Sequence, residues 1–308
     1  MATHVVPLER RSLRGSFSRD FPPILEVESG DTVVISCPDV AWRLSAPPAG
    51  PVYERHPEQD AGHALIGPIG VRGARTGQTL EVAIDEVRVG PFGSTASGGR
   101  STRLNDRLGL TDAPETLLVW ALDGDRGIAR DQHGRELELR PFPGILGMPP
   151  PEPGIHPTQP PRRFGGNIDC NLLVAGTRLY LPIPVDGALF FAGDGHARQG
   201  DGELGQQAIE CPLERLVLTL TVREDIELAT PRAWTPDAWV TFGFDEDLDE
   251  ACALAVEAML DLMGEEWGVQ PTEALALATA VVDVRVTQLV NGVRGSHAVL
   301  RHDAVRFP

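Results

Sequence analysis

Short runs of alternating apolar and polar residues, separated by glycine and proline, constrain the fold of this chain more than any other feature. Residues Ile24–Glu28 and Thr32–Ser36 flank a Ser-Gly-Asp turn, and residues Thr79–Val87 alternate with a period of two. Such alternation places successive side chains on opposite faces of a β-strand. The chain also contains 33 glycines and 27 prolines, which suit the turns between strands. The pattern predicts a mainly β fold of the sandwich or barrel kind.

Helical periodicity is found only near the C-terminus. Apolar residues recur at helical spacing between Asp247 and Gly264, and the acidic residues at the start of this segment match the helix dipole. A second helix is expected from Thr272, as N-cap, to Val281, followed by a strand over residues 283–288. The sequence therefore predicts a small α+β region with two helices near residues 247–282.

A proline-rich segment divides the chain. Residues 141–163 contain nine prolines, which favours an extended surface loop that wraps the following unit or links two units. We therefore expect a β-rich domain over residues 1–140, a connecting loop over 141–163, and a second β-rich domain over 164–308 that carries the α+β region.

Composition excludes several classes of function. All 27 basic residues are arginine, so Schiff-base chemistry, a lysine base and a Walker-type phosphate loop are excluded. The net charge of −17 argues against nucleic acid as a partner. The sequence has no apolar run of the ~18 residues that span a bilayer, so no membrane association is expected. Four widely spaced cysteines without a Cys-x-x-Cys pair predict reduced thiols in a cytoplasmic protein.

Residue types that bind metals and move protons are concentrated in two clusters, Gly165–Asp169 and Gly193–Glu203. The apolar stretch Leu179–Phe191 between them contains a Val-Asp-Gly turn, which predicts a hairpin of two antiparallel strands. A hairpin brings its two ends together, so we expect the polar residues of both clusters to meet. These residues are Asn167, Asp169, Asp194 and His196.

Carboxylates, an imidazole and an amide oxygen form a suitable site for a divalent cation such as zinc or calcium. Asp194 and His196 are two residues apart, so on a strand both side chains face the same ion. Glu203 is predicted to be an outer ligand or the general base that accepts a proton from water. The alternative is that the Gly-Asp-Gly sequences are ordinary turns whose carboxylates cap backbone amides.

The two clusters, with the stretch between them, resemble the central signature of the acetamidase/formamidase family. The resemblance extends to nearly the whole chain. It includes residues Phe17–Val33, then Gly67–Val82, and the C-terminal block Asp283–Asn291. Two positions depart from the family pattern: Arg198 stands where a small residue is usual, and His63 lies in a Gly-His-Ala sequence where an Asn-Pro pair is expected.

The resemblance implies a jelly-roll-like β-sandwich in the N-terminal part, packed with the β-rich C-terminal part. It also implies hydrolysis of a small aliphatic amide, a divalent metal held by the central Asn, Asp and His groups, and a homodimer or larger homo-oligomer. Within this interpretation Glu203 is the proton shuttle, His63 is a further proton donor or ligand, and Asn167 or Arg198 orients the substrate.

Two other functions remain open from the sequence. The first keeps the reaction but changes the substrate to a cyclic imide, a lactam or a larger amide. The second is a non-catalytic jelly-roll binding protein in which the same groups hold a structural ion.

Overall fold

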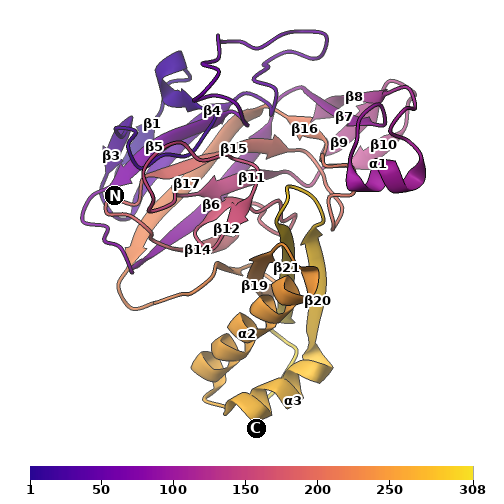
Figure 1. Cartoon of the computed structure of the whole chain (residues 1–308). Coiled ribbons are helices and arrows are strands. Elements are labelled where there is room, and N and C mark those ends of the chain that lie inside the picture. The colour runs from indigo at the N-terminus through magenta and orange to yellow at the C-terminus, as the bar shows by residue number, and fades with distance from the viewer. Residues whose placement is uncertain (308) are drawn as a thin grey trace.

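The computed structural model describes residues 1–307 and is built mainly of β-strands (Figure 1). One sheet has nine strands in the order β1 (Thr3–Val5), β4 (Asp31–Cys37), β17 (Leu213–Arg223), β6 (Thr79–Val89), β14 (Arg178–Pro182), β18 (Arg232–Trp234), β19 (Ala238–Asp245), β21 (Arg294–Arg301) and β20 (Val282–Gln288). The mainly β prediction is confirmed. The strands expected near residues 24–36, 79–87 and 283–288 are present.

The second sheet has twelve strands within the described residues. Its main path is β10 (Glu136–Glu138), β9 (Ile128–Asp131), β8 (Thr116–Asp123), β7 (Phe92–Ser97), β16 (Glu210–Cys211), β15 (Phe190–His196), β11 (Phe142–Gly147), β13 (Gly165–Asn167) and β12 (Pro161–Arg162). The first part of β15 also pairs with β5 (Leu65–Val71), which in turn pairs with β2 (Leu13–Arg14) and β3 (Leu25–Val27).

Both sheets combine strands from before and after the proline-rich segment. A continuous apolar core joins their facing sides, with Ile66 and Phe190 from the second sheet and Leu80 and Leu218 from the first, all fully buried. Burial of this apolar area is the main stabilising contribution to such a fold. The domain boundaries at 140 and 164 stay a prediction, while the core extends across them.

The expectation that residues 141–163 form a surface loop is wrong for their first part. Residues Phe142–Gly147 are strand β11, and all six are buried. Pro143 lies opposite Gly195 near one end of the pairing with β15, and β13 on the other side pairs only with residues 145–147, so the proline lies outside the part of β11 that is paired on both sides. Residues 149–160, which contain most of the prolines of this segment, do form an irregular connection to β12.

The two helices near residues 247–282 are confirmed. Helix α2 (Leu248–Trp267) begins at Asp247, whose side chain accepts the Asp249 amide hydrogen, and continues past Gly264 to end at Gly268. Helix α3 (Pro271–Val281) has Gln270 as its N-cap, so the expectation for Thr272 is wrong; Pro271 at the first helical position explains the shift. Both pack at one end of the first sheet, near β19–β21 (Figure 1).

A short helix, α1 (Arg103–Leu108), lies beside β7–β10, away from α3 (Figure 1). It was not expected, because six residues carry too little periodicity. Within residues 1–307, the structure has no helix with the length and apolar character needed to cross a membrane.

Candidate functional site

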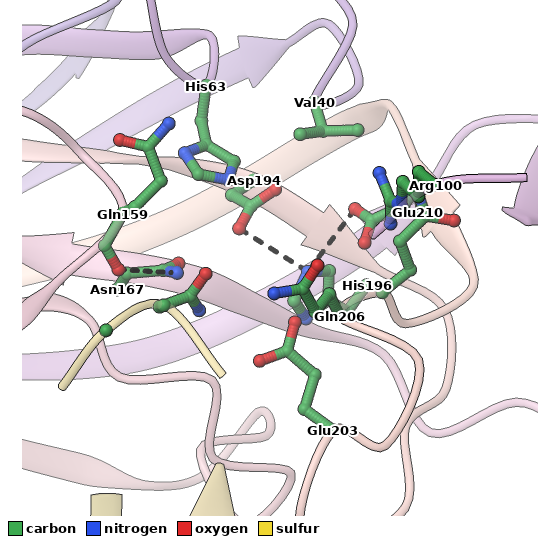
Figure 2. A pocket seen from close by; sticks show the side chains of 13 residues that line it. Val40, His63, Arg100, Gln159, Asn167, Asp194, His196, Glu203, Gln206 and Glu210 are labelled. Atoms are coloured by element: carbon green, nitrogen blue, oxygen red, sulfur yellow. Dashed lines mark hydrogen bonds and ion pairs between the residues drawn. The ribbon is translucent and has the colours of Figure 1, made fainter. Parts of the chain in front are cut away.

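A cavity of about 530 Å³ lies where β15, β16 and the loops around residues 203 and 291 meet (Figure 2). Its wall is rich in polar side chains, among them His63, Arg100, Asn167, Asp194, His196, Glu203, Gln206, Glu210 and Asn291. The volume lies within the range of small-molecule sites in proteins, about 300–1,000 Å³. The cavity therefore combines space for a ligand with groups that bind cations and transfer protons.

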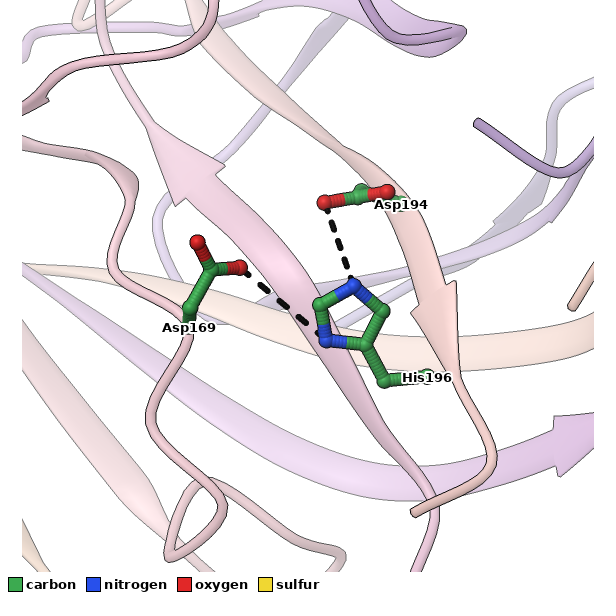
Figure 3. A group of neighbouring side chains, drawn as sticks. All are labelled: Asp169, Asp194 and His196. Atoms are coloured by element: carbon green, nitrogen blue, oxygen red, sulfur yellow. Dashed lines mark ion pairs between the residues drawn. The ribbon is translucent and has the colours of Figure 1, made fainter. Parts of the chain in front are cut away.

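Three buried side chains converge beside this cavity: Asp194 and His196 line it, and Asp169 lies next to them (Figure 3). One potential ligand atom from each lies within 4.8 Å of the other two. The Nε2 atom of His196 is 3.4 Å from Asp194 Oδ2, and its Nδ1 atom is 4.0 Å from Asp169 Oδ1. The predicted meeting of the two clusters is therefore present in the structure.

The expected hairpin does not produce this meeting. Strands β14 and β15 belong to different sheets, so residues 179–191 pass from one layer to the other. Strand β11 lies between the two clusters instead, pairing with β13 on one side and β15 on the other. The Asp169 amide donates to the carbonyl oxygen of Gly144 on β11 (3.2 Å). The site is thus assembled by a central strand that the sequence did not indicate.

Gly144 forms the floor of the three-residue cluster. A Cβ atom at this position would lie 2.7 Å from Asp169 Oδ1, Asp194 Oδ2 and His196 Cε1, closer than real Cβ contacts allow. Only glycine leaves this space free, and the free space lies at the point on which the three groups converge.

Unusual backbone conformations gather at this site. Eight non-glycine residues within 1–307 have a positive φ angle, and five of them belong to the cluster or the cavity wall: Asp169, Asp194, Glu203, Gln206 and Asn291. Non-glycine residues adopt this left-handed region at a free-energy cost, and such strain is concentrated at functional sites. The backbone is therefore shaped to aim these side chains.

Two further carboxylates flank the three converging groups. Glu210, opposite His196 in the β15–β16 pairing, places Oε2 3.4 Å from His196 Nε2. Glu203 follows the Gly200–Gly202 turn and is also buried. Figure 2 shows both side chains directed toward His196. Four carboxylates thus surround one imidazole in a space from which water is largely excluded.

This arrangement shifts the pKa values of Asp169, Glu203 and His196. Burial raises the pKa of Asp169 well above its usual range, and the charge of Glu203 adds to the rise. Burial also raises the pKa of Glu203 to about 8; His196 opposes this rise, and Glu210 and Asp194 add to it. Burial alone would lower the pKa of His196, but the charges of Glu210 and Asp194 raise it well above its usual range.

The donor set fits a divalent cation. Ten buried side-chain nitrogen or oxygen atoms within residues 1–307 have no hydrogen-bond partner, and six of them come from the cluster and its surroundings: Asn167 Oδ1, Asp169 Oδ1, Asp194 Oδ1, His196 Nδ1, Glu203 Oε2 and Glu210 Oε2. Buried polar atoms are rarely left without a partner. Imidazole and carboxylate groups are ligands of zinc, and carboxylate and amide oxygens are ligands of calcium.

The structure brings most of the predicted site residues together. Asn167 lines the cavity, and its Nδ2 donates to the Gln159 carbonyl oxygen (3.0 Å) while its Oδ1 stays without a partner. His63 also lines the cavity, with Nδ1 2.6 Å from Thr158 Oγ1. Arg198 is the exception: it is absent from the cavity wall, and its guanidinium donates to the Glu138 carbonyl oxygen (2.6 Å).

Three polar residues at the site were missed by the sequence analysis. Glu210 lies in a two-residue strand without a motif. Gln288 and Asn291 both donate toward Asp169 Oδ2 at 3.4 Å, and Gln288 also donates to the Asn167 carbonyl oxygen (2.7 Å). The C-terminal block that resembles the family contains Gln288 and Asn291, so the signal for those two was present without a role attached.

Comparison with known proteins places the chain in the family that its sequence resembles. The sequence model of the Acetamidase/Formamidase family matches residues 7–156 and 152–227, so the chain belongs to this family. The acetamidase of Mycolicibacterium smegmatis is 26% identical over 200 residues, covering 46% of this chain and 49% of that protein. The formamidase of Methylophilus methylotrophus is 26% identical over 236 residues, covering 60% and 58%. The match therefore spans about half the length of these two relatives.

The likeness in structure covers nearly the whole chain. The crystal structure of an acetamidase from Bacillus halodurans superimposes with a TM-score of 0.84 at 26% identity, covering 98% of this chain and 97% of that one. The Asp169, Asp194 and His196 cluster thus lies in a fold that this chain shares with a protein described as an acetamidase.

Proposed function

We propose that this protein is an amidase that hydrolyses the C–N bond of a linear amide to a carboxylate and ammonia. The observation that carries the proposal is the buried carboxyl group of Glu203, which has an oxygen without a partner and lies in the same cavity as His196 and Asp194. A proton acceptor beside a cation site is the arrangement that water activation requires. Membership of the Acetamidase/Formamidase family supports this reaction.

We propose Asp169, Asp194 and His196 as ligands of a divalent cation, zinc or calcium, with Asn167 Oδ1 as a fourth candidate. A cation bound there supplies a Lewis acid that polarises a carbonyl group and makes water more acidic. Gln288 and Asn291 hold the Asp169 carboxylate in place from behind, which limits its rotation.

Glu203 moves the proton in this proposal. Its carboxylate accepts a proton from the attacking water as the water oxygen bonds to the amide carbon. It then donates that proton to the leaving nitrogen when the C–N bond breaks, so ammonia leaves and the acid remains. Burial, which raises the pKa of Glu203 above its usual range, helps the carboxyl group to hold the proton between the two steps.

His63 and Asn167 are proposed to orient the amide. Thr158 Oγ1 bonds Nδ1 of His63 and fixes the ring at the cavity wall, so Nε2 is free for the substrate. If Asn167 Oδ1 does not bind the cation, it is placed to accept a hydrogen from the amide nitrogen. Arg198 is left out of the proposed set, because its guanidinium is engaged with the Glu138 carbonyl. A homo-oligomeric, cytoplasmic enzyme is part of the proposal, based on the family resemblance and the reduced thiols.

The test is ammonia release from formamide, acetamide and propionamide, beside ring opening of succinimide, which is followed by its ultraviolet absorbance because that hydrolysis releases no ammonia. The purified protein is assayed before chelation, after chelation and dialysis, and after zinc or calcium is added back. We expect turnover of at least one linear amide, its loss on chelation, and its return with one of the two ions. Ion binding without ammonia release from any amide would instead support the non-catalytic binding protein.

A further inference from the structure

A second cavity of about 440 Å³ adjoins the first. Gln206, Asn291 and Gly292 line both, so the two cavities are neighbours that share one wall. The second cavity lies between α1 and the loops that carry Leu204 and Leu289. Neither the proposed cation site nor the proposed proton transfer uses it.

The wall shared with the catalytic cavity is held in place by backbone hydrogen bonds. The Gly202 amide donates to the Thr287 carbonyl oxygen and the Leu289 amide donates to the Gly202 carbonyl oxygen, both at 3.1 Å. Leu204 directly follows Glu203, and Leu289 directly follows Gln288. An apolar surface therefore begins one residue away from Glu203, which lines the first cavity, and from Gln288, which donates toward Asp169.

The leucine side chains of this apolar surface are unusually exposed to solvent. Leu204 is 61% exposed, Leu104 of α1 is 38% exposed and Leu289 is 36% exposed, and all three line the second cavity. Apolar side chains gathered around a concave surface mark a binding site more often than isolated exposed leucines do. The methylene groups of a ligand would remove these side chains from water.

The second cavity also has an excess of positive charge, in a chain whose net charge is −17. Arg103 and Arg107 of α1 line it, and neither has an ion pair or a side-chain hydrogen bond within the described residues 1–307. Arg100, also without such a partner there, lines the first cavity. Arginines elsewhere on this acidic surface commonly pair with carboxylates, as Arg223 does with Asp225. Unpaired guanidinium groups beside an apolar groove favour an anionic group in the ligand.

The volumes of the two cavities also favour a ligand larger than formamide or acetamide. Formamide and acetamide have three and four non-hydrogen atoms, whereas each of the two cavities is large enough for a ligand of many more atoms. A substrate confined to the cation site would leave the leucines and arginines unused.

We propose that the preferred substrate is an amide whose acyl chain is apolar and ends in a carboxylate, that is, a monoamide of a dicarboxylic acid. Its amide group lies at His196 and Glu203, its methylene groups lie against Leu204 and Leu289, and its carboxylate binds Arg103 and Arg107. This inference rests on the proposed amidase function and specifies its substrate class.

The test compares two chain-length series. The monoamides of succinate, glutarate, adipate and suberate are assayed beside the neutral amides with the same number of carbons. For the best chain length we expect kcat/KM of the acidic amide to exceed that of its neutral partner by about ten- to a hundredfold, the effect of a charge-assisted hydrogen bond. This ratio should fall as salt is raised from 0.05 to 0.5 M, because the interaction is partly exposed to solvent.

The double variant Arg103→Gln/Arg107→Gln should bring the ratio of acidic to neutral amide close to one. The control is the double variant Arg163→Gln/Arg306→Gln, which removes the same charge from two arginines outside both cavities. It should keep the wild-type ratio. Equal turnover of acidic and neutral amides by the wild type, or an equal loss of the ratio in both double variants, would overturn the inference.

A binding experiment distinguishes failure of the proposed amidase function from failure of the proposed arginine site. If no amide in either series releases ammonia, calorimetric titration of the Glu203→Gln protein with adipamate and with hexanamide still tests the arginine site. Tighter binding of adipamate that is lost in the Arg103→Gln/Arg107→Gln background would support an anion site in a protein that is not an amidase. Equal binding of the two would overturn the inference as well.

Discussion

Replacing Gly144 by alanine is the most direct perturbation of the proposed cation site. The new methyl group would lie 2.7 Å from Asp169 Oδ1, Asp194 Oδ2 and His196 Cε1. The backbone of Gly144 is not in the left-handed region, so alanine is compatible with its conformation. The substitution therefore changes the space at the centre of the site and little else.

The expected loss of cation affinity in Gly144→Ala follows from these distances. Real Cβ atoms do not approach other atoms to less than 3.0 Å, so each of the three groups must retreat by about 0.3 Å. Metal–ligand distances tolerate only about 0.2 Å. We expect cation affinity to fall by ~10–100-fold or more, the range seen when a supporting residue is lost. Overpacking of this kind costs ~1–3 kcal/mol of stability, which a protein of this size tolerates.

The assay measures cation affinity by competition with a chelator, together with amide turnover and the thermal unfolding midpoint. Gly124→Ala is the control, because its added methyl group meets nothing within 4 Å. That variant should match the wild type in all three measurements.

A Gly144→Ala protein that is folded and binds the cation as tightly as the wild type would refute the reasoning. Such a result would mean that the ion lies away from the point where Asp169, Asp194 and His196 converge. Loss of affinity only together with global unfolding would be resolved by repeating the titration below the unfolding temperature.

Three further predictions follow. Glu203→Gln should keep the cation and lose ~10²–10⁴-fold in kcat, whereas His196→Ala should lose cation and activity together; elemental analysis beside ammonia release separates the two roles. Cys170→Ala with Cys211→Ala should keep full activity, because burial raises the pKa of Cys170 to about 12 and that of Cys211 well above its usual range, so neither forms a thiolate nucleophile near neutral pH. Burial lowers the pKa of His297 from 6.5 to about 4. Between these values the unfolded chain binds a proton that the folded protein does not, so about 3 kcal/mol of stability should be lost as pH falls from 6.5 to 4. Denaturant titrations of the wild type and His297→Gln should show this slope only in the wild type.

The fold was predictable where local pattern decides local structure. The period-two alternation over residues 79–87 predicted strand β6. The apolar residues at helical spacing after Asp247 predicted the position of helix α2. Burial of strand β11, at the start of the proline-rich segment, was not predictable, because the sequence Pro-Phe-Pro-Gly shows turn residues but not the neighbouring strands that enclose it. Pairing partners distant in sequence leave no periodic signal in either strand.

The site residues were predictable from their chemistry more than from their geometry. Asp169 and His196 were grouped correctly because cation ligands of suitable types occurred in two short clusters. The hairpin proposed to join them does not exist, and β11 joins them instead. Glu210 could not have been found, because a glutamate between Ile209 and Cys211 carries no motif and acquires its role only through pairing with His196.

The glycines of β15 show why a short sequence can specify such a site. Asp194 and His196 point toward the cation site, as the two-residue spacing predicted, and Gly193 and Gly195 point to the other face. A Cβ atom at Gly193 would lie 2.5 Å from the Ala64 carbonyl oxygen, and one at Gly195 would lie 2.5 Å from the Cys211 carbonyl oxygen. The alternative interpretation of Gly-Asp-Gly as an ordinary turn does not hold for these two glycines, because they lie within β15 and allow neighbouring backbones to approach closely. Alternation of glycine with cation ligands therefore encodes both faces of one strand: close packing on one side and chemistry on the other.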